Sequence, residues 1–149
     1  MVKLMRFSKA AFVSFALTFL LAAMPAASED RKFSNADLRG RYGWNVEGTA
    51  FGTSLDAIRQ FTADGQGTFS GEGIVNFGTG NVPHTSVCSY SVKPNGIGTA
   101  TCNSPELGAE HFAFVLIDEG NEARFISTTP GVIIKGNAGK QGISRRNDR

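Results

Sequence analysis

An arginine and several aromatic residues in the middle of the chain are the residues best placed to bind a small molecule. Arg59 and Phe61 lie in one run of alternating residues, and Phe69 and Gly71 lie in the next. If a three-residue turn joins the two runs, Phe61 faces Phe69. Arg59 then falls opposite Gly71 on the same face, where an inward guanidinium could bind a carboxylate or phosphate. A β-bulge would instead turn Arg59 into solvent, where arginine is common.

The two histidines of the mature chain do not predict a metal site. A hairpin in which Cys88 faces Cys102 places His84 opposite Glu106, and His111 falls near Cys102 on the following run. The strand from His84 to Cys88 alone spans about 13 Å, too far for a shared site. We therefore expect each histidine to be exposed or hydrogen-bonded on its own. A three-histidine zinc site also lacks its third histidine, so no metal is predicted. No cofactor and no catalytic residue are predicted either.

The two cysteines flank a turn signal. Pro94, Asn95 and Gly96 suit the successive positions of a three-residue hairpin loop. In that register Cys88 and Cys102 face each other directly, at a Cα separation of about 4.5 to 5.5 Å that a disulfide tolerates. We predict a cross-strand disulfide, and closing a loop of about 15 residues contributes roughly 3 kcal/mol.

The N-terminal residues have the three parts of a secretory signal peptide. Three basic residues precede an apolar run at 10–23, and small residues follow at 26–28. The run is short for a membrane span and Pro25 follows it, so a signal peptide over 1–28 is favoured over an anchor. We expect a secreted or periplasmic protein with no integral membrane span after cleavage. Its mature charge is close to neutral and gives no reason to expect nucleic-acid binding.

After the signal, the chain is typical of one all-β domain. Residues 29–40 form an N-terminal segment with a single helical turn that Ser34 and Asp37 would cap, as a lid or plug. About eight short runs of alternating residues then follow over 41–141, joined by hairpin-sized turns. An antiparallel up-and-down barrel hides the sheet edges most simply, and a two-sheet sandwich is the alternative. The tail at 142–149 is expected to be disordered.

One of these runs, at 110–117, is apolar on both sides. Phe112, Phe114 and Leu116 would share one face, and the other face would carry Ala113, Val115 and Ile117. Such a strand should be covered on both faces, or lie across a corner or an interface.

The first strand resembles that of the calycin barrels, the lipocalin and avidin-like proteins. The resemblance rests on Leu38-x-Gly40-x-Tyr42-x-Trp44 after a helical turn, and on the avidin-like pattern Gly-Thr-Phe-Ser-Gly at 67–71. It implies a closed antiparallel barrel. The chain departs from the family by placing Tyr42 where the tryptophan usually stands, so no ligand-contacting residue of those families is assigned here.

The whole chain is also similar to a group of small secreted bacterial proteins. The shared patterns are Leu-x-Gly-x-Tyr at 38–42, Phe-x-x-Asp-Gly-x-Gly at 61–67 and Phe-Ile-x-Thr-x-Pro-Gly at 125–131. This resemblance implies export and a β-barrel, and it implies no particular activity.

Three functions are compatible with these features. The first is a non-enzymatic secreted or periplasmic barrel that binds a small apolar or amphipathic molecule, lined by Tyr42, Trp44, Arg59, Phe61, Phe69 and Tyr90. The second is a structural or protein-interaction module of the cell envelope, with a filled barrel, an exposed apolar patch from 112–117 and scope for a homo-oligomer. The third is a barrel-type cyclase or isomerase, with polar groups that converge in the cavity.

Overall fold

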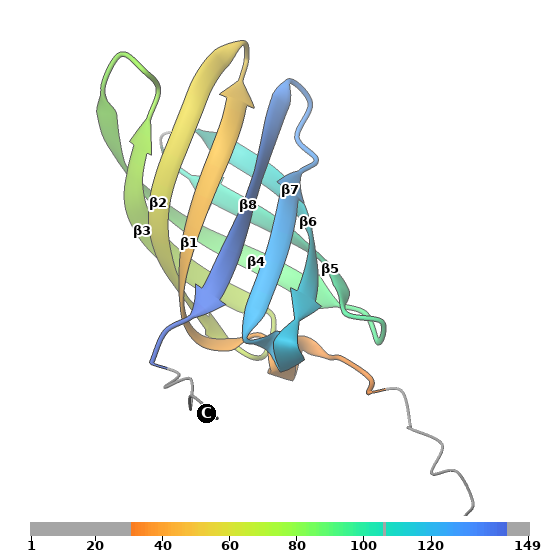
Figure 1. Ribbon diagram of the computed structural model, residues 1–149. Helices are drawn as coiled ribbons and strands as arrows, with labels where there is room; N and C mark the ends of the chain where they lie inside the picture. The colour runs from red at the N-terminus through yellow and green to blue at the C-terminus, as the bar shows by residue number, and fades with distance from the viewer. Residues whose placement is uncertain (1–30, 106, 143–149) are drawn as a thin grey trace, which may run out of the picture.

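The computed structural model describes residues 31–105 and 107–142, which form a closed barrel (Figure 1). Each strand pairs antiparallel with the next, and the last pairs with the first, so the predicted up-and-down barrel is confirmed and the sandwich is not formed. The strands are β1 (Arg39–Ala50), β2 (Thr53–Asp64), β3 (Thr68–Asn76), β4 (Asn81–Val92), β5 (Ile97–Ser104), β6 (Gly108–Ile117), β7 (Glu122–Ser127) and β8 (Val132–Lys140). Two 3-10 turns, η1 (Asn35–Asp37) and η2 (Asp118–Gly120), complete the described elements.

The predicted signal peptide at 1–28 and nearly all of the predicted tail at 142–149 lie outside the described residues. Within the described residues, no helix is long and apolar enough to cross a membrane.

Alternation along the strands separates a packed interior from the outer wall. Tyr42, Trp44 and Val46 of β1 point inward and are buried, as the sequence pattern predicts. The apolar strand β6 buries Phe112 on its inner side, while Val115 on its outer side is 37% exposed. Its outer neighbours Ala113 and Ile117 are only half-buried, so within the described chain the expectation of cover on both faces is wrong. In a single closed sheet only one face can meet the core, and the interface alternative stays a prediction.

The hairpin of β4 and β5 has the predicted register and the predicted disulfide. Cys88 pairs directly with Cys102, with a Cα separation of 4.0 Å and a bond between the two sulfurs. The backbone N–H of Lys93 donates to the carbonyl oxygen of Ile97 at 2.8 Å, which closes the turn. Gly96 adopts a positive φ of 83°, the conformation that this loop requires at its last position.

The predicted register of β2 and β3 is wrong by two residues. Phe61 pairs with Gly71 instead of Phe69, and Arg59 therefore lies opposite Gly73. The reason is the side chain of Asp64, whose Oδ1 accepts hydrogen bonds from the backbone N–H groups of residues 66, 67 and 68 and so moves the turn to 65–67. A shift of two residues keeps every side chain on its predicted face. Phe61 and Phe69 consequently remain in contact, with ring centroids 4.9 Å apart.

One end of the barrel is closed by the two 3-10 turns, at the bottom of Figure 1. The Ser34 backbone N–H donates to the carboxylate of Asp37 at 2.8 Å, so the predicted capped turn is confirmed. The hydroxyl of Tyr90 donates to the carbonyl oxygen of Leu38 at 2.8 Å, and that of Tyr42 to Gly120 at 2.6 Å. These contacts attach both turns to the barrel as a plug, which leaves the opposite end as the entrance.

Candidate functional site

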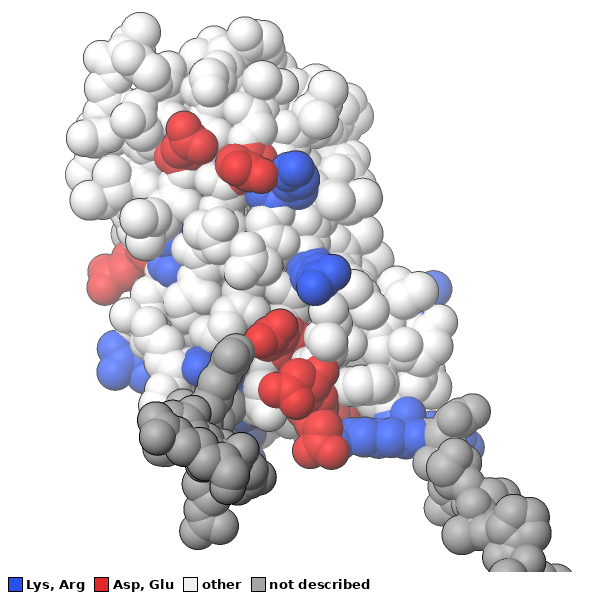
Figure 2. Space-filling model, in the orientation of Figure 1, with Lys and Arg blue, Asp and Glu red and all other residues white. Residues whose placement is uncertain are grey.

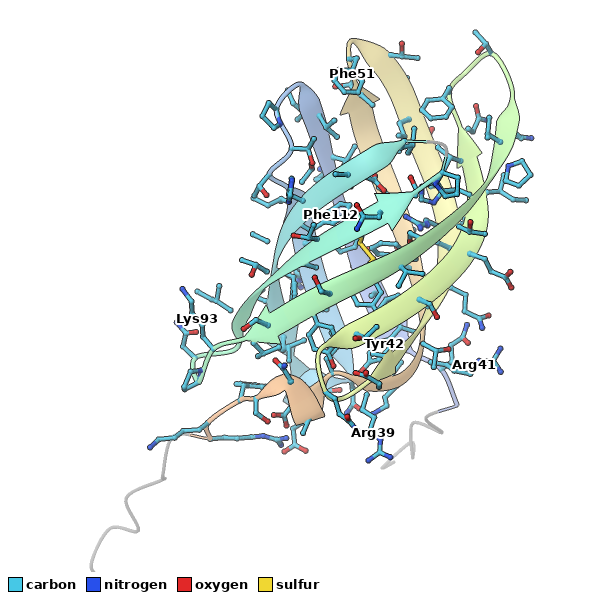
Figure 3. The ribbon with its side chains drawn as sticks, turned by 180° about the vertical axis from the view of Figure 1, so that it is seen from behind. Arg39, Arg41, Tyr42, Phe51, Lys93 and Phe112 are labelled. Atoms are coloured by element: carbon cyan, nitrogen blue, oxygen red, sulfur yellow. A yellow bond between two sulfur atoms is a disulfide. The ribbon has the colours of Figure 1, made fainter. Side chains whose placement is uncertain are left out.

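The open end of the barrel contains a cup of about 450 Å³. The cup is surrounded by residues from the four hairpins on this side of the barrel, at or next to their turns. Figure 3 shows Phe51 on the rim, far from Tyr42 at the plugged end. Most of the wall is apolar, and three threonines complete it near the rim. The apolar residues are Ala50, Phe51, Leu55, Phe77, Leu107, Ala109, Val132 and Ile134.

Charged side chains are scarce among the described residues at this end. Glu110 is the one charged residue among the described residues that line the cup. On the face shown in Figure 2, the end of the molecule around the β1–β2 hairpin has no Lys, Arg, Asp or Glu, and the charged side chains lie nearer the plug. Among the described residues, the lining of the cup is therefore apolar apart from one carboxylate.

Glu110 stands next to a fully buried histidine. The Nε2 atom of His84 lies 3.6 Å from Oε2 of Glu110, and the side chains are 1% and 15% exposed respectively. Neither ring nitrogen of His84, nor Oε2 of Glu110, has a hydrogen-bond partner among the described residues. Buried polar atoms are normally paired, so these atoms identify a place where a ligand or water would gain hydrogen bonds.

Arg59 lies in the same inner layer, behind the cup. It is 6% exposed, its Nη2 donates a hydrogen bond of 2.5 Å to Ser86 Oγ, and its guanidinium stands 4.7 Å from the centre of the Trp44 ring. Arg59 pairs with Gly73, which in turn pairs with His84, so only a glycine separates the two polar residues on this face. We call Arg59, His84, Ser86 and Glu110 the polar layer.

Gly73 makes this arrangement sterically feasible. A Cβ atom at Gly73 would lie 2.6 Å from Cγ of Arg59 and 2.4 Å from the carbonyl oxygen of Ile58. The inward direction of Arg59 is therefore as the sequence suggested, but the space over the neighbouring glycine is already filled by the arginine itself.

The predicted aromatic lining lies deeper, towards the plug. Ring centroids of Tyr42 and Phe61 are 4.9 Å apart, and those of Phe69 and Tyr90 are 5.9 Å apart. A cavity that Trp44, Phe61 and Phe69 help to line measures about 30 Å³, room for about one water molecule. The structure thus brings the six predicted residues together inside the barrel, but the space large enough for a ligand lies on the other side of the polar layer.

The sequence reasoning missed Glu110, which lines the cup, and its buried neighbour His84. The expectation of an exposed or hydrogen-bonded histidine is wrong for His84, which is buried and faces Glu110. For His111 it is correct, because that side chain is exposed and lies 3.2 Å from the hydroxyl of Thr101. A signal was present: His84 is four residues from the inward Cys88, an even spacing that puts both on the same face.

The described residues contain no group of three or more His, Cys, Asp or Glu side chains that could hold a metal ion. Comparisons of the chain with protein-family models, with curated proteins and with solved structures found no match. The functional argument therefore depends on the geometry of the cup and of the polar layer.

Proposed function

We propose that this protein is a non-enzymatic barrel that binds a small apolar or amphipathic molecule in the cup at its open end. The observation that carries the proposal is an apolar cup of about 450 Å³ above buried polar atoms that have no hydrogen-bond partner in the described part of the chain. Small-molecule sites have volumes of about 300 to 1,000 Å³ and few polar groups, which set the orientation of the ligand. The apolar part of the molecule would contact Leu55 and Ile134, and its polar end would reach Glu110.

The six residues predicted from the sequence take a supporting role in this proposal. Arg59 and Trp44 form the layer behind Glu110 and hold the base of the cup in place. Tyr42 and Tyr90 use their hydroxyls to attach the plug, and Phe61 and Phe69 fill the space between. A rigid, filled lower half keeps the cup preformed, which lowers the entropic cost of binding.

We also propose that the protein acts outside the cytoplasm. The disulfide between Cys88 and Cys102 supports this location, because such bonds persist in oxidising compartments. The N-terminal pattern of a signal peptide supports it independently. N-terminal sequencing of the protein purified from its source tests it: a mature chain that begins after residue 28 is expected, and an intact N-terminus would contradict export by cleavage.

A blocking variant tests the binding proposal. Ala50 is half-buried and lines the cup, whereas its neighbour Thr49 points to solvent. Ala50→Trp should fill the cup and weaken binding of the hydrophobic probe N-phenyl-1-naphthylamine, measured by the rise of probe fluorescence. Thr49→Trp adds the same side chain outside and should bind the probe like the wild type. No binding to the wild type, or equal binding to both variants, would contradict the proposal.

An interaction module of the cell envelope remains the alternative function, and one observation favours it. Ile97, Val115 and Ile126 on the outer wall are 46%, 37% and 56% exposed, and Ile97 pairs directly with Val115. Apolar side chains gathered in this way are typical of protein contacts. Native mass spectrometry separates the two functions: a co-purifying small molecule supports the cup, and a dimer that Ile126→Asp dissociates supports the module.

A further inference from the structure

We infer that the polar end of the bound molecule is a hydrogen-bond donor, an alcohol or an amine, and that carboxylates bind poorly. This inference rests on the proposed function and concerns the same cup. It starts from Glu110, the one charged residue among the described residues of the lining. An ionised carboxylate only accepts hydrogen bonds, so the group that meets it must donate.

The unfilled hydrogen-bonding capacity of the cup's base points the same way. Oε2 of Glu110 is buried without a hydrogen-bond partner among the described residues, and it lies 3.6 Å from Nε2 of His84. That separation is too long for a hydrogen bond between the two side chains. A donor group in contact with both side chains would satisfy the carboxylate, and the lone pairs of a hydroxyl could also accept a hydrogen bond from the imidazole.

The position of Arg59 argues against a carboxylate ligand. Arg59 does not line the cup, and its guanidinium donates to Ser86 and lies over the ring of Trp44. An anionic head that entered the cup would meet the carboxylate of Glu110 before it could approach the arginine. Like charges in a poorly hydrated site repel strongly, so Glu110 selects against anions.

The walls define the rest of the molecule. Leu55, Val132 and Ile134 line the cup with apolar side chains, and three threonines lie near the rim. The ligand class is therefore an apolar body with one donor head, such as a long-chain or terpenoid alcohol or amine.

Three ligands of equal chain length test the head group. We would titrate 1-decanol, decylamine and decanoate, below their micellar concentrations, into the intact mature protein by isothermal calorimetry. The single tryptophan, Trp44, gives a second readout because it lies against Arg59 behind the cup. The expected result is that the alcohol and the amine bind at least about tenfold more tightly than decanoate, the scale of a hydrogen bond to a charged group. Decanoate as the tightest ligand would overturn the inference while leaving the binding function intact.

A matched pair of variants assigns the preference to one side chain. Glu110→Gln keeps the shape but removes the charge, and it should reduce the preference for amine over carboxylate by about tenfold or more. Glu47→Gln makes the same change on the outer wall, where Glu47 is 60% exposed, and should leave the preference unchanged. An unchanged preference in Glu110→Gln would overturn the inference. Failure of all three ligands and of the naphthylamine probe to bind the wild type would instead refute the proposed function.

Discussion

The hydroxyl of Tyr42 makes one of the contacts that hold the plug on the barrel. It donates a hydrogen bond of 2.6 Å to the carbonyl oxygen of Gly120 in η2, and the side chain is fully buried. The ring stacks on Phe61 with centroids 4.9 Å apart and planes 7° apart. Tyr42→Phe therefore removes the donor alone, since a phenylalanine ring can keep the same stacking.

The cost of this variant follows from the acceptor it leaves behind. The Gly120 carbonyl oxygen would stay buried without this donor, a loss of about 1 to 3 kcal/mol in the free energy of unfolding. For a domain of this size that lowers the melting temperature by roughly 4 to 12 °C. Urea unfolding of both proteins at neutral pH measures the difference. Ser91→Ala, which removes an exposed hydroxyl from β4, is the control and should change stability by less than about 0.5 kcal/mol.

The pH dependence gives a second test of the same contact. Burial raises the pKa of Tyr42 above the ordinary value of 10.0, and the negative charge of Asp37 adds to the effect. Burial also raises the pKa of Tyr90, with a further contribution from Asp64. Because folding favours the neutral phenols, their contribution to stability is fully present below pH 10 and is lost as the pH rises through the raised pKa values.

These two are the only tyrosines in the chain, so phenolate absorbance reports on the plug alone. We expect neither tyrosine to ionise near its ordinary pKa, and ionisation to accompany alkaline unfolding. A tyrosine that titrates with an ordinary pKa in the still folded protein, or a Tyr42→Phe variant as stable as the wild type, would refute the account of the closed end.

Two further predictions concern the disulfide and the β2–β3 turn. Replacing both cysteines by alanine should lower the free energy of unfolding by roughly 3 kcal/mol, because the bond joins residues 14 apart in sequence. Urea unfolding measures the loss, and a loss below about 1 kcal/mol would contradict this prediction. Hydrogen bonds from the backbone N–H groups of Thr68 and Gln66 lower the pKa of Asp64. The stabilisation by the ionised Asp64 carboxylate is therefore present above its ordinary pKa and is lost as the pH falls through the lowered pKa. Asp64→Ala should thus be less stable than the wild type at pH 7, with a gap that narrows in acid, and a gap independent of pH would show that the carboxylate does not hold the turn.

Much of the barrel could be predicted from short-range patterns. Alternation placed Tyr42 and Trp44 inside, and the Pro94–Gly96 turn determined which residues of β4 and β5 face each other. The β2–β3 register was predicted wrongly because it depends on hydrogen bonds that the Asp64 side chain accepts from backbone N–H groups, and the lengths of the alternating runs carry no information about such bonds. Local side-chain chemistry, where it competes with turn propensity, decides the register.

The cup could not be predicted in the same way. Its lining comes from four hairpins and the strand ends next to them, and their separation depends on the tilt and stagger of the closed sheet. Glu110 and His84 lie on strands that are not adjacent, so no pairwise register connects them. The aromatic residues were the conspicuous feature of the sequence, and in the structure they fill the lower half of the barrel.

The location of a bound molecule tests the central claim most directly. Nuclear Overhauser effects between 1-decanol and the methyl groups of the protein can be measured on a sample labelled at Ile, Leu and Val. The account predicts contacts from the alkyl chain to Leu55, Val132 and Ile134, which line the cup. Contacts confined to Ile97, Val115 and Ile126 on the outer wall, or no contacts at all, would contradict it.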